Sequence, residues 1–200
     1  DASVTGTGSI VIDETNAITL SDVDTVNGDI TVNAGGLINA TDVVATGGNV
    51  ILNAQGLLTA TLVEGEDVTL DTTTGGMNLI SVTASNQLQA TADSGSIAVY
   101  SISAPTVTLT ATTGAITDDS DETVDVVATN LTATSATGIN LDTTITSLDA
   151  SVTGTGSIVI DETNAITLSD VDTVNGDITV NAGGLINATD VVATGGNVIL

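Results

Sequence analysis

Short apolar segments recur about every 20 residues along this chain, and this period constrains the fold more than any other feature. In each segment one residue separates two apolar residues, which is the alternation of a β-strand with one buried face. The segments begin at Ile10, Ile30, Val50, Val68, Leu88, Val107 and Leu131, and the series resumes at Ile158. A single coil of this length cannot bury its own apolar face, so the period predicts coils that stack on one another.

A second, longer repeat is superposed on the first. Residues 149–200 are identical to residues 1–52, so a unit of 148 residues begins at Asp1 and again at Asp149. We therefore expect residues 1–148 to form one full repeat and residues 149–200 to begin the next, within one continuous segment of residues 1–200. Counting apolar segments from Ile10 to Ile158 predicts about seven coils per long repeat. Function is then expected in the repeated surface before any single site.

Each coil contains two further apolar stretches, separated by polar turns that usually hold glycine, as at residues 33–36 and 53–56. This pattern predicts a parallel β-helix with three short strands per coil, in which glycine at the corners adopts positive φ. Coils about 4.8 Å apart would advance roughly 34 Å per long repeat. The alternative is an array of immunoglobulin-like sandwiches, but these have aromatic cores and units of about 100 residues.

The composition excludes several classes of function. The chain has 25 acidic residues and no Lys, Arg or His, which gives a net charge of −25. Nucleic acids and anionic membrane surfaces are therefore not expected as partners, because both are bound through cationic side chains. The absence of cysteine excludes a disulfide scaffold and thiolate zinc sites. Nucleophilic triads also need residue types that are missing, so we do not expect an enzyme. No apolar run is long enough to span a membrane.

The coil motif resembles the repeats of filamentous haemagglutinin-like exoproteins. The shared pattern is apolar-x-apolar-x-Ala-x-x-Gly-x-apolar, which occurs with small variations at residues 30–37 and 107–116. The resemblance covers essentially the whole chain. It implies a right-handed parallel β-helix shaft of a giant adhesin, secreted by the two-partner route to the bacterial cell surface. The handedness of the coil is an expectation from this resemblance alone.

Two groups of acidic residues are candidate Ca²⁺ sites, because closely spaced hard oxygen ligands suit this ion. The first is the run Asp118, Asp119, Asp121 and Glu122, which falls in a lengthened coil and is expected to bulge out as a loop. The second is a corner at which successive coils place like charges close together. Its members are Asp22, Asp24, Asp42 and Glu64, with Glu66 and Asp67 beyond them. In both cases the alternative is a solvated acidic surface without an ion.

Other polar patterns have simpler interpretations. Asp13, Asn33, Asn53 and Asp71 occupy one position of consecutive coils and are expected to form a structural ladder of stacked side chains. Glycan cleavage by a carboxylate pair would use Asp118 and Asp121. Alternate threonines over residues 106–112 could present an ice-binding row, but the neighbouring coils interrupt it.

The hypothesis that we favour is a structural shaft of a long extracellular filament or adhesin. Its partners would be further copies of itself, stacked end to end or side by side, and cell-surface or host-cell glycans or proteins. The second hypothesis is an acidic solenoid whose stiffness or bundling depends on bound Ca²⁺. The third is a glycan-cleaving β-helix enzyme.

Overall fold

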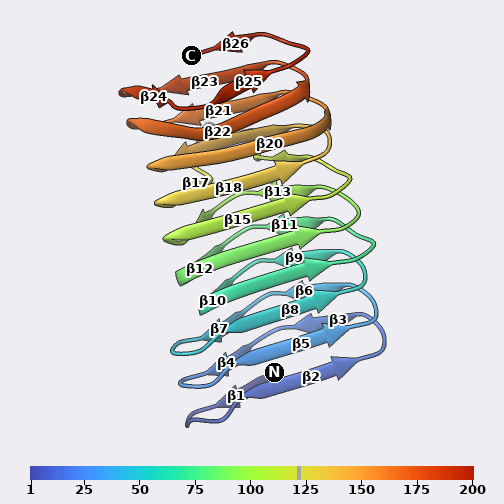
Figure 1. The fold of residues 1–200 in the computed structure, drawn as a ribbon. Coiled ribbons are helices and arrows are strands. Elements are labelled where there is room, and N and C mark those ends of the chain that lie inside the picture. Colours follow the sequence, from blue (N-terminus) through green and yellow to red (C-terminus); the bar gives the residue numbers. More distant parts are fainter. Residues whose placement is uncertain (121–122) are drawn as a thin grey trace.

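The computed structural model describes residues 1–120 and 123–200, which form one all-β coil (Figure 1). In Figure 1 the nearer strands β2 (Ile10–Glu14) and β5 (Ile30–Ala34) run from left to right. The fainter strands β3 (Ile18–Leu20) and β6 (Ile38–Ala40) return behind them while the chain climbs. This course is right-handed, with about ten coils roughly 20 residues apart. The parallel β-solenoid predicted from the period is confirmed, and the sandwich alternative is excluded.

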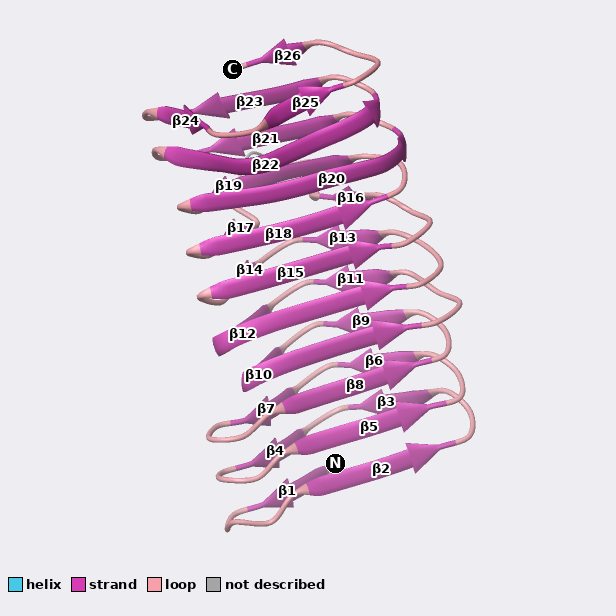
Figure 2. Cartoon of the chain, in the orientation of Figure 1, coloured by secondary structure: helices cyan, strands magenta, loops and turns pink. Residues whose placement is uncertain are grey.

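The strands form three parallel stacks, one for each side of the coil (Figure 2). We number the stacks in the order in which the chain passes through them, beginning with the stack that contains β2. The first stack adds to β2 and β5 the following strands: β8 (Val50–Ala54), β10 (Val63–Thr72), β12 (Val82–Ala92), β15 (Thr106–Ala111), β18 (Asn130–Ser135), β20 (Ser147–Thr155), β22 (Ile166–Asn175) and β25 (Val191–Ala193).

The second stack adds the following strands to β3 and β6: β9 (Leu58–Ala60), β11 (Met77–Leu79), β13 (Ile97–Val99), β16 (Ile116–Thr117), β19 (Ile139–Thr144), β21 (Ile158–Glu162), β23 (Ile178–Ala182) and β26 (Val198–Ile199). The third stack contains β1 (Ala2–Val4), β4 (Val23–Thr25), β7 (Val43–Ala45), β14 (Ile102–Ser103) and β17 (Val126–Val127). The early residues of β10 and β12 and the end of β19 complete this third stack. The strand β24 (Ile186–Ala188) pairs with the early residues of β22, of which Thr167 and Leu168 pair in turn with Ser147 and Leu148 of β20.

The core is a narrow column in which like residues lie over like residues. Along β5 the side chains of Ile30, Val32 and Ala34 are buried, whereas Thr31 and Asn33 on the outer face are half-buried. Small and β-branched residues fill so narrow an interior without aromatic rings. The first stack confirms six of the predicted register steps, and they join Ile10, Ile30, Val50, Val68, Leu88, Val107 and Leu131.

The second copy of the repeat lies one stack further on than the first. Seven register steps along the third stack lead from Ala2 to Thr143. The chain then enters the first stack, where Ala150, the copy of Ala2, pairs with Ala133. The 148 residues therefore fill about seven coils, as predicted, and one further side of the coil. In consequence β2 belongs to the first stack, and its copy β21 belongs to the second.

The sequence-based placement of Ile158 above Leu131 is therefore wrong. Leu131 pairs with Leu148, whereas Ile158 pairs with Ile139 in the second stack. The cause lies in β19, which passes from the second stack to the third without an intervening turn. This coil consequently closes early, and Leu148 arrives above Leu131.

Close contact between coils, more than backbone conformation, accounts for most of the glycines. Among the described glycines only Gly95 and Gly138 have a positive φ, of 107° and 136°. A Cβ atom on Gly28 would lie 2.0 Å from the carbonyl oxygen of Gly8, and one on Gly48 would lie 2.2 Å from that of Gly28. The expectation of positive φ at the corners therefore holds at few positions, and the lack of a Cβ is what the other corners require.

We predict that Gly48→Ala lowers the free energy of unfolding by about 1–3 kcal/mol, because the added methyl group must push two coils apart. Gly6→Ala is the matched control, since a Cβ at that position has no neighbouring atom within 4 Å. It should change stability by no more than about 0.5 kcal/mol. Denaturant unfolding followed by circular dichroism measures both variants. Equal losses would show that backbone freedom, and not contact between coils, selects glycine.

Candidate cation site

A ladder of hydrogen-bonded side chains runs up the outside of the first stack, as the sequence predicts. The Asn33 side-chain amide donates to Asp13 Oδ1 at 2.7 Å, and the Asn53 amide donates to Asn33 Oδ1 at 2.8 Å. Asp71 follows Asn53 in register, and partial burial raises the pKa of the Asp71 carboxyl. The Asn33 and Asn53 amides thus lie between the carboxylates of Asp13 and Asp71, which are three coils apart.

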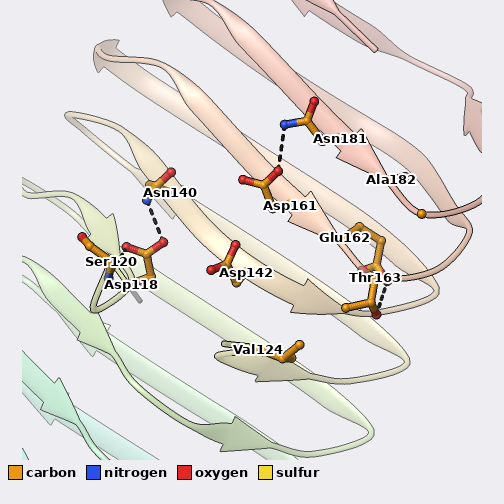
Figure 3. Close-up of a pocket in the computed structure, with 11 residues that line it drawn as sticks. Asp118, Ser120, Val124, Asn140, Asp142, Asp161, Glu162, Thr163, Asn181 and Ala182 are labelled. Atoms are coloured by element: carbon orange, nitrogen blue, oxygen red, sulfur yellow. Dashed lines mark hydrogen bonds between the residues drawn. The ribbon is translucent and has the colours of Figure 1, made fainter. Parts of the chain in front are cut away.

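A groove follows this ladder in each copy of the repeat. In the first copy the groove has a volume of about 600 Å³, and its lining includes Asp13, Asn33, Asn53 and Asp71. In the second copy the corresponding groove, of about 610 Å³, contains the equivalent residues Asp161 and Asn181. Figure 3 shows that this second groove also contains residues from the end of the first repeat, namely Asp118, Asn140 and Asp142. The groove at the joint between repeats is therefore richer in carboxylates.

The loop before β17 supplies one of these carboxylates. Most coils pass from the second stack to the third through two residues, such as Ser21 and Asp22, but residues 118–125 make this connection between β16 and β17. The two strands are thus further apart in the sequence than in the other coils, and of the predicted acidic run the structure describes residues 118–120. Asp118 and Asp119 are half-buried. Asp121 and Glu122, the other two predicted ligands, lie outside the described residues. Asp121 is also one of the two carboxylates considered for glycan cleavage.

Two hydrogen bonds fix the Asp118 side chain. The Asn140 amide donates to Oδ2 at 2.8 Å, and the backbone N–H of Ser120 donates to Oδ1 at 3.1 Å (Figure 3). Ser120 has a φ of 66°, and it is the only non-glycine residue with a positive φ among those that the structure describes. The loop backbone therefore turns sharply just after Asp118 and holds its carboxylate at the groove.

Asp118, Asp125 and Asp142 converge at this point. One carboxylate oxygen of each lies within 4.8 Å of the other two, and among the described residues this is the group arranged to share a metal ion. Asp125 is only 1% exposed. Its Oδ2 accepts a hydrogen bond from the backbone N–H of Asp142 at 3.3 Å, whereas its Oδ1 is buried without a partner.

Burial, the largest cause, and the negative charges of Asp118, Asp119 and Asp142 together raise the pKa of the Asp125 carboxyl to about 7. The hydrogen bond from the Asp142 backbone N–H acts in the opposite direction. The ionised form of Asp125 is thus unfavourable here, because it is removed from water and surrounded by like charges.

Sequence reasoning placed Asp125 just beyond the acidic run, outside the predicted ligands, and did not single out Asp142. Asp125 occupies the corner position held by Ser101 one coil below, since the N–H of Ile102 donates to the Asp125 carbonyl at 2.7 Å. Asp142 lies above Asp125, and the N–H of Asp125 donates to the Asp142 carbonyl at 2.9 Å. Only the register of the shortened coil brings these residues together, and no local motif marks that register.

The structure gathers three of the four residues predicted at the second acidic corner. Burial raises the pKa of Asp24, and a hydrogen bond with Asp22 and the charges of Asp22 and Asp42 add to this rise. Asp42 Oδ1 is also buried without a hydrogen-bond partner. Glu64 is separated from Asp24, because Val44 lies between them in the third stack.

Glu162 is a further buried acidic residue that the sequence analysis did not single out. It is 4% exposed, and its Oε2 accepts hydrogen bonds from the Thr143 hydroxyl and the Ile145 N–H, both at 2.8 Å. Its copy Glu14 is half-buried and accepts a bond from the N–H of Asn16 at 2.9 Å. Through these hydrogen bonds Glu162 of the second repeat contacts the last coil of the first repeat.

Comparison with family models, with curated proteins and with solved structures finds no match in any of the three. The resemblance to filamentous haemagglutinin-like exoproteins therefore stays a prediction from the coil motif. The part of the chain that the structure describes contains no helix long and apolar enough to cross a membrane.

We predict that the chain becomes less stable as pH rises from about 4 to about 7 in the presence of a chelator. The pKa of Asp125 is higher in the folded chain, at about 7, than the usual value for an aspartate. The folded state therefore binds more protons than the unfolded state in this window, and stability falls as the proton is lost.

Melting temperatures measured across this pH range test the prediction with Asp125→Asn, which should show a weaker dependence on pH. Asp93→Asn is the control, because it removes one exposed carboxylate and changes the net charge equally. If both variants follow the wild-type curve, Asp125 is not the group responsible.

Proposed function

We propose that this chain is a segment of the shaft of a long extracellular bacterial filament or adhesin, which acts as spacer and scaffold for surface attachment or cell–cell contact. The main support is the continuity of the stacks across the joint between repeats. Residues 130–135 of β18 pair in register with residues 147–152 of β20, and β19 pairs with β21 over residues 139–143 and 158–162. A joint of this kind allows many repeats to extend a single rod.

The surface chemistry is compatible with this role. The chain has no cationic side chain and no thiol, and its net charge of −25 opposes side-by-side clumping of neighbouring rods. The partners that we propose are further copies of the repeat, which stack along the axis, and cell-surface or host-cell glycans or proteins. We do not propose catalysis, because the sequence contains no His, Lys or Cys to serve as the base or nucleophile of a triad.

We predict that each added copy of the 148-residue unit lengthens the molecule by about 35 Å at constant cross-section, since coils are about 4.8 Å apart. Small-angle scattering from chains with one and two added units measures the length and the cross-sectional radius separately. A cross-section that grows with each unit, or scattering from separate globules on flexible joints, would contradict the shaft.

The location of the protein provides an independent test. Antibodies raised against this chain should label intact, unpermeabilised cells of the organism that produces it, at a distance from the cell envelope. Labelling that needs permeabilised cells would overturn the extracellular role and leave the rod itself untouched.

A further inference from the structure

The three carboxylates at the joint between repeats have the spacing of a shared ion site. Ligand oxygens on opposite sides of Ca²⁺ are about 4.6–5.2 Å apart, because each bond is 2.3–2.6 Å long. The corresponding limit for Mg²⁺ is about 4.2 Å. The oxygens of Asp118, Asp125 and Asp142 all lie within 4.8 Å of one another, which fits the larger ion without rearrangement.

A separate observation indicates that this position needs a ligand. Asp125 is 1% exposed, and its Oδ1 has no hydrogen-bond partner. A buried charge of this kind is strongly unfavourable unless it is paired or bound to a metal. The sequence contains no Lys, Arg or His, so no side chain of this chain can supply the missing positive charge.

We propose that Asp118, Asp125 and Asp142 bind one Ca²⁺ ion at the joint between successive repeats. Asp125 provides the buried oxygen, and Asp118 approaches from the loop that Asn140 and Ser120 hold in place. Asp142 belongs to β19, where it pairs with Asp161 of the second repeat. The ion therefore ties the inserted loop to the strand on which the next repeat is built.

This geometry gives the inserted loop a purpose. The connection between β16 and β17 is longer than the usual two residues, and at its two ends Asp118 and Asp125 lie against a third carboxylate from the following coil. The coil above is the shortened one, so the bound ion strengthens the place where the regular spacing of the solenoid is broken. The proposal does not depend on the shaft function, because it concerns one site within the 200-residue chain.

The test uses the whole chain, freed of metal and held at physiological ionic strength to suppress unspecific attraction by the acidic surface. Calorimetric titration should show one Ca²⁺ per chain with a dissociation constant on the order of 10⁻⁴ M, as in exposed extracellular sites. Ca²⁺ should raise the melting temperature, and Mg²⁺ at the same concentration should raise it less.

Variants separate this site from general screening of charge. Asp125→Asn should weaken Ca²⁺ binding at least tenfold and abolish the rise in melting temperature. Without metal, it should melt at or above the wild-type temperature, because it removes a buried unpaired charge. Asp142→Asn should lose the response to Ca²⁺ as well, and it serves as the test if Asp125→Asn fails to fold.

Asp93→Asn is the matched control and should keep the full response, because this carboxylate is exposed and lies in a different coil. Two results would overturn the proposal. One is a wild-type chain whose melting temperature does not respond to Ca²⁺ in the millimolar range. The other is an equal response from all the variants, which would mean that the ion only screens the acidic surface.

Discussion

Backbone hydrogen bonds between one coil and the next hold neighbouring strands about 4.8 Å apart, and this spacing decides which side chains each position can hold. Within the paired strands, residues meet their counterparts in the coils above and below. Apolar residues benefit from this, as the buried column from Ile30 through Val50 and Val68 illustrates. At tight corners the same spacing leaves no room for a Cβ atom, as at Gly28 and Gly48. The composition follows from the geometry of stacking.

Stacking creates a difficulty for a chain whose ionised side chains are all acidic, because like charges then meet at one coil spacing. The structure answers this in three ways. Amides separate carboxylates in the ladder that begins at Asp13 and Asn33. Backbone N–H groups donate hydrogen bonds to other carboxylates, as the N–H of Asn49 does to Asp29 Oδ1 at 2.8 Å. At Asp125 one oxygen, Oδ1, has neither kind of partner, the pKa of the buried carboxyl rises, and a proton or an external cation becomes the remaining means of neutralisation.

The sequence predicted the class of fold and most of the register, because alternation of apolar residues and the 20-residue period are properties that each coil shows by itself. It failed where one coil departs from the others. Ile158 continues the periodic series as well as Leu148 does, and only the absence of a turn within β19 decides between them. The ladder of Asp13 and Asn33 was found because its members are one period apart.

The candidate ion site was only partly visible for the same reason. The acidic run that includes Asp118 stands out in the sequence, but the register of an irregular coil brings Asp142 to Asp125. Glu162 and Glu14 occupy equivalent positions of the two copies, yet the side chain of Glu162 is buried between coils and that of Glu14 is half-buried. Local sequence alone cannot distinguish two copies whose difference lies in the coil beneath them.

The single extra side in each repeat has a consequence for how a long array meets its surroundings. In the array that we propose, each repeat would turn the next by about a third of a revolution, so successive repeats would be related by an approximate threefold screw. Any given surface would return to the same direction after three repeats, or about 105 Å. Identical units would thus produce a rod with no preferred side. A partner that lies along one edge of such a rod would contact a given surface patch only once in every three repeats. Partners that approach from different directions would each have that patch facing them at some repeat.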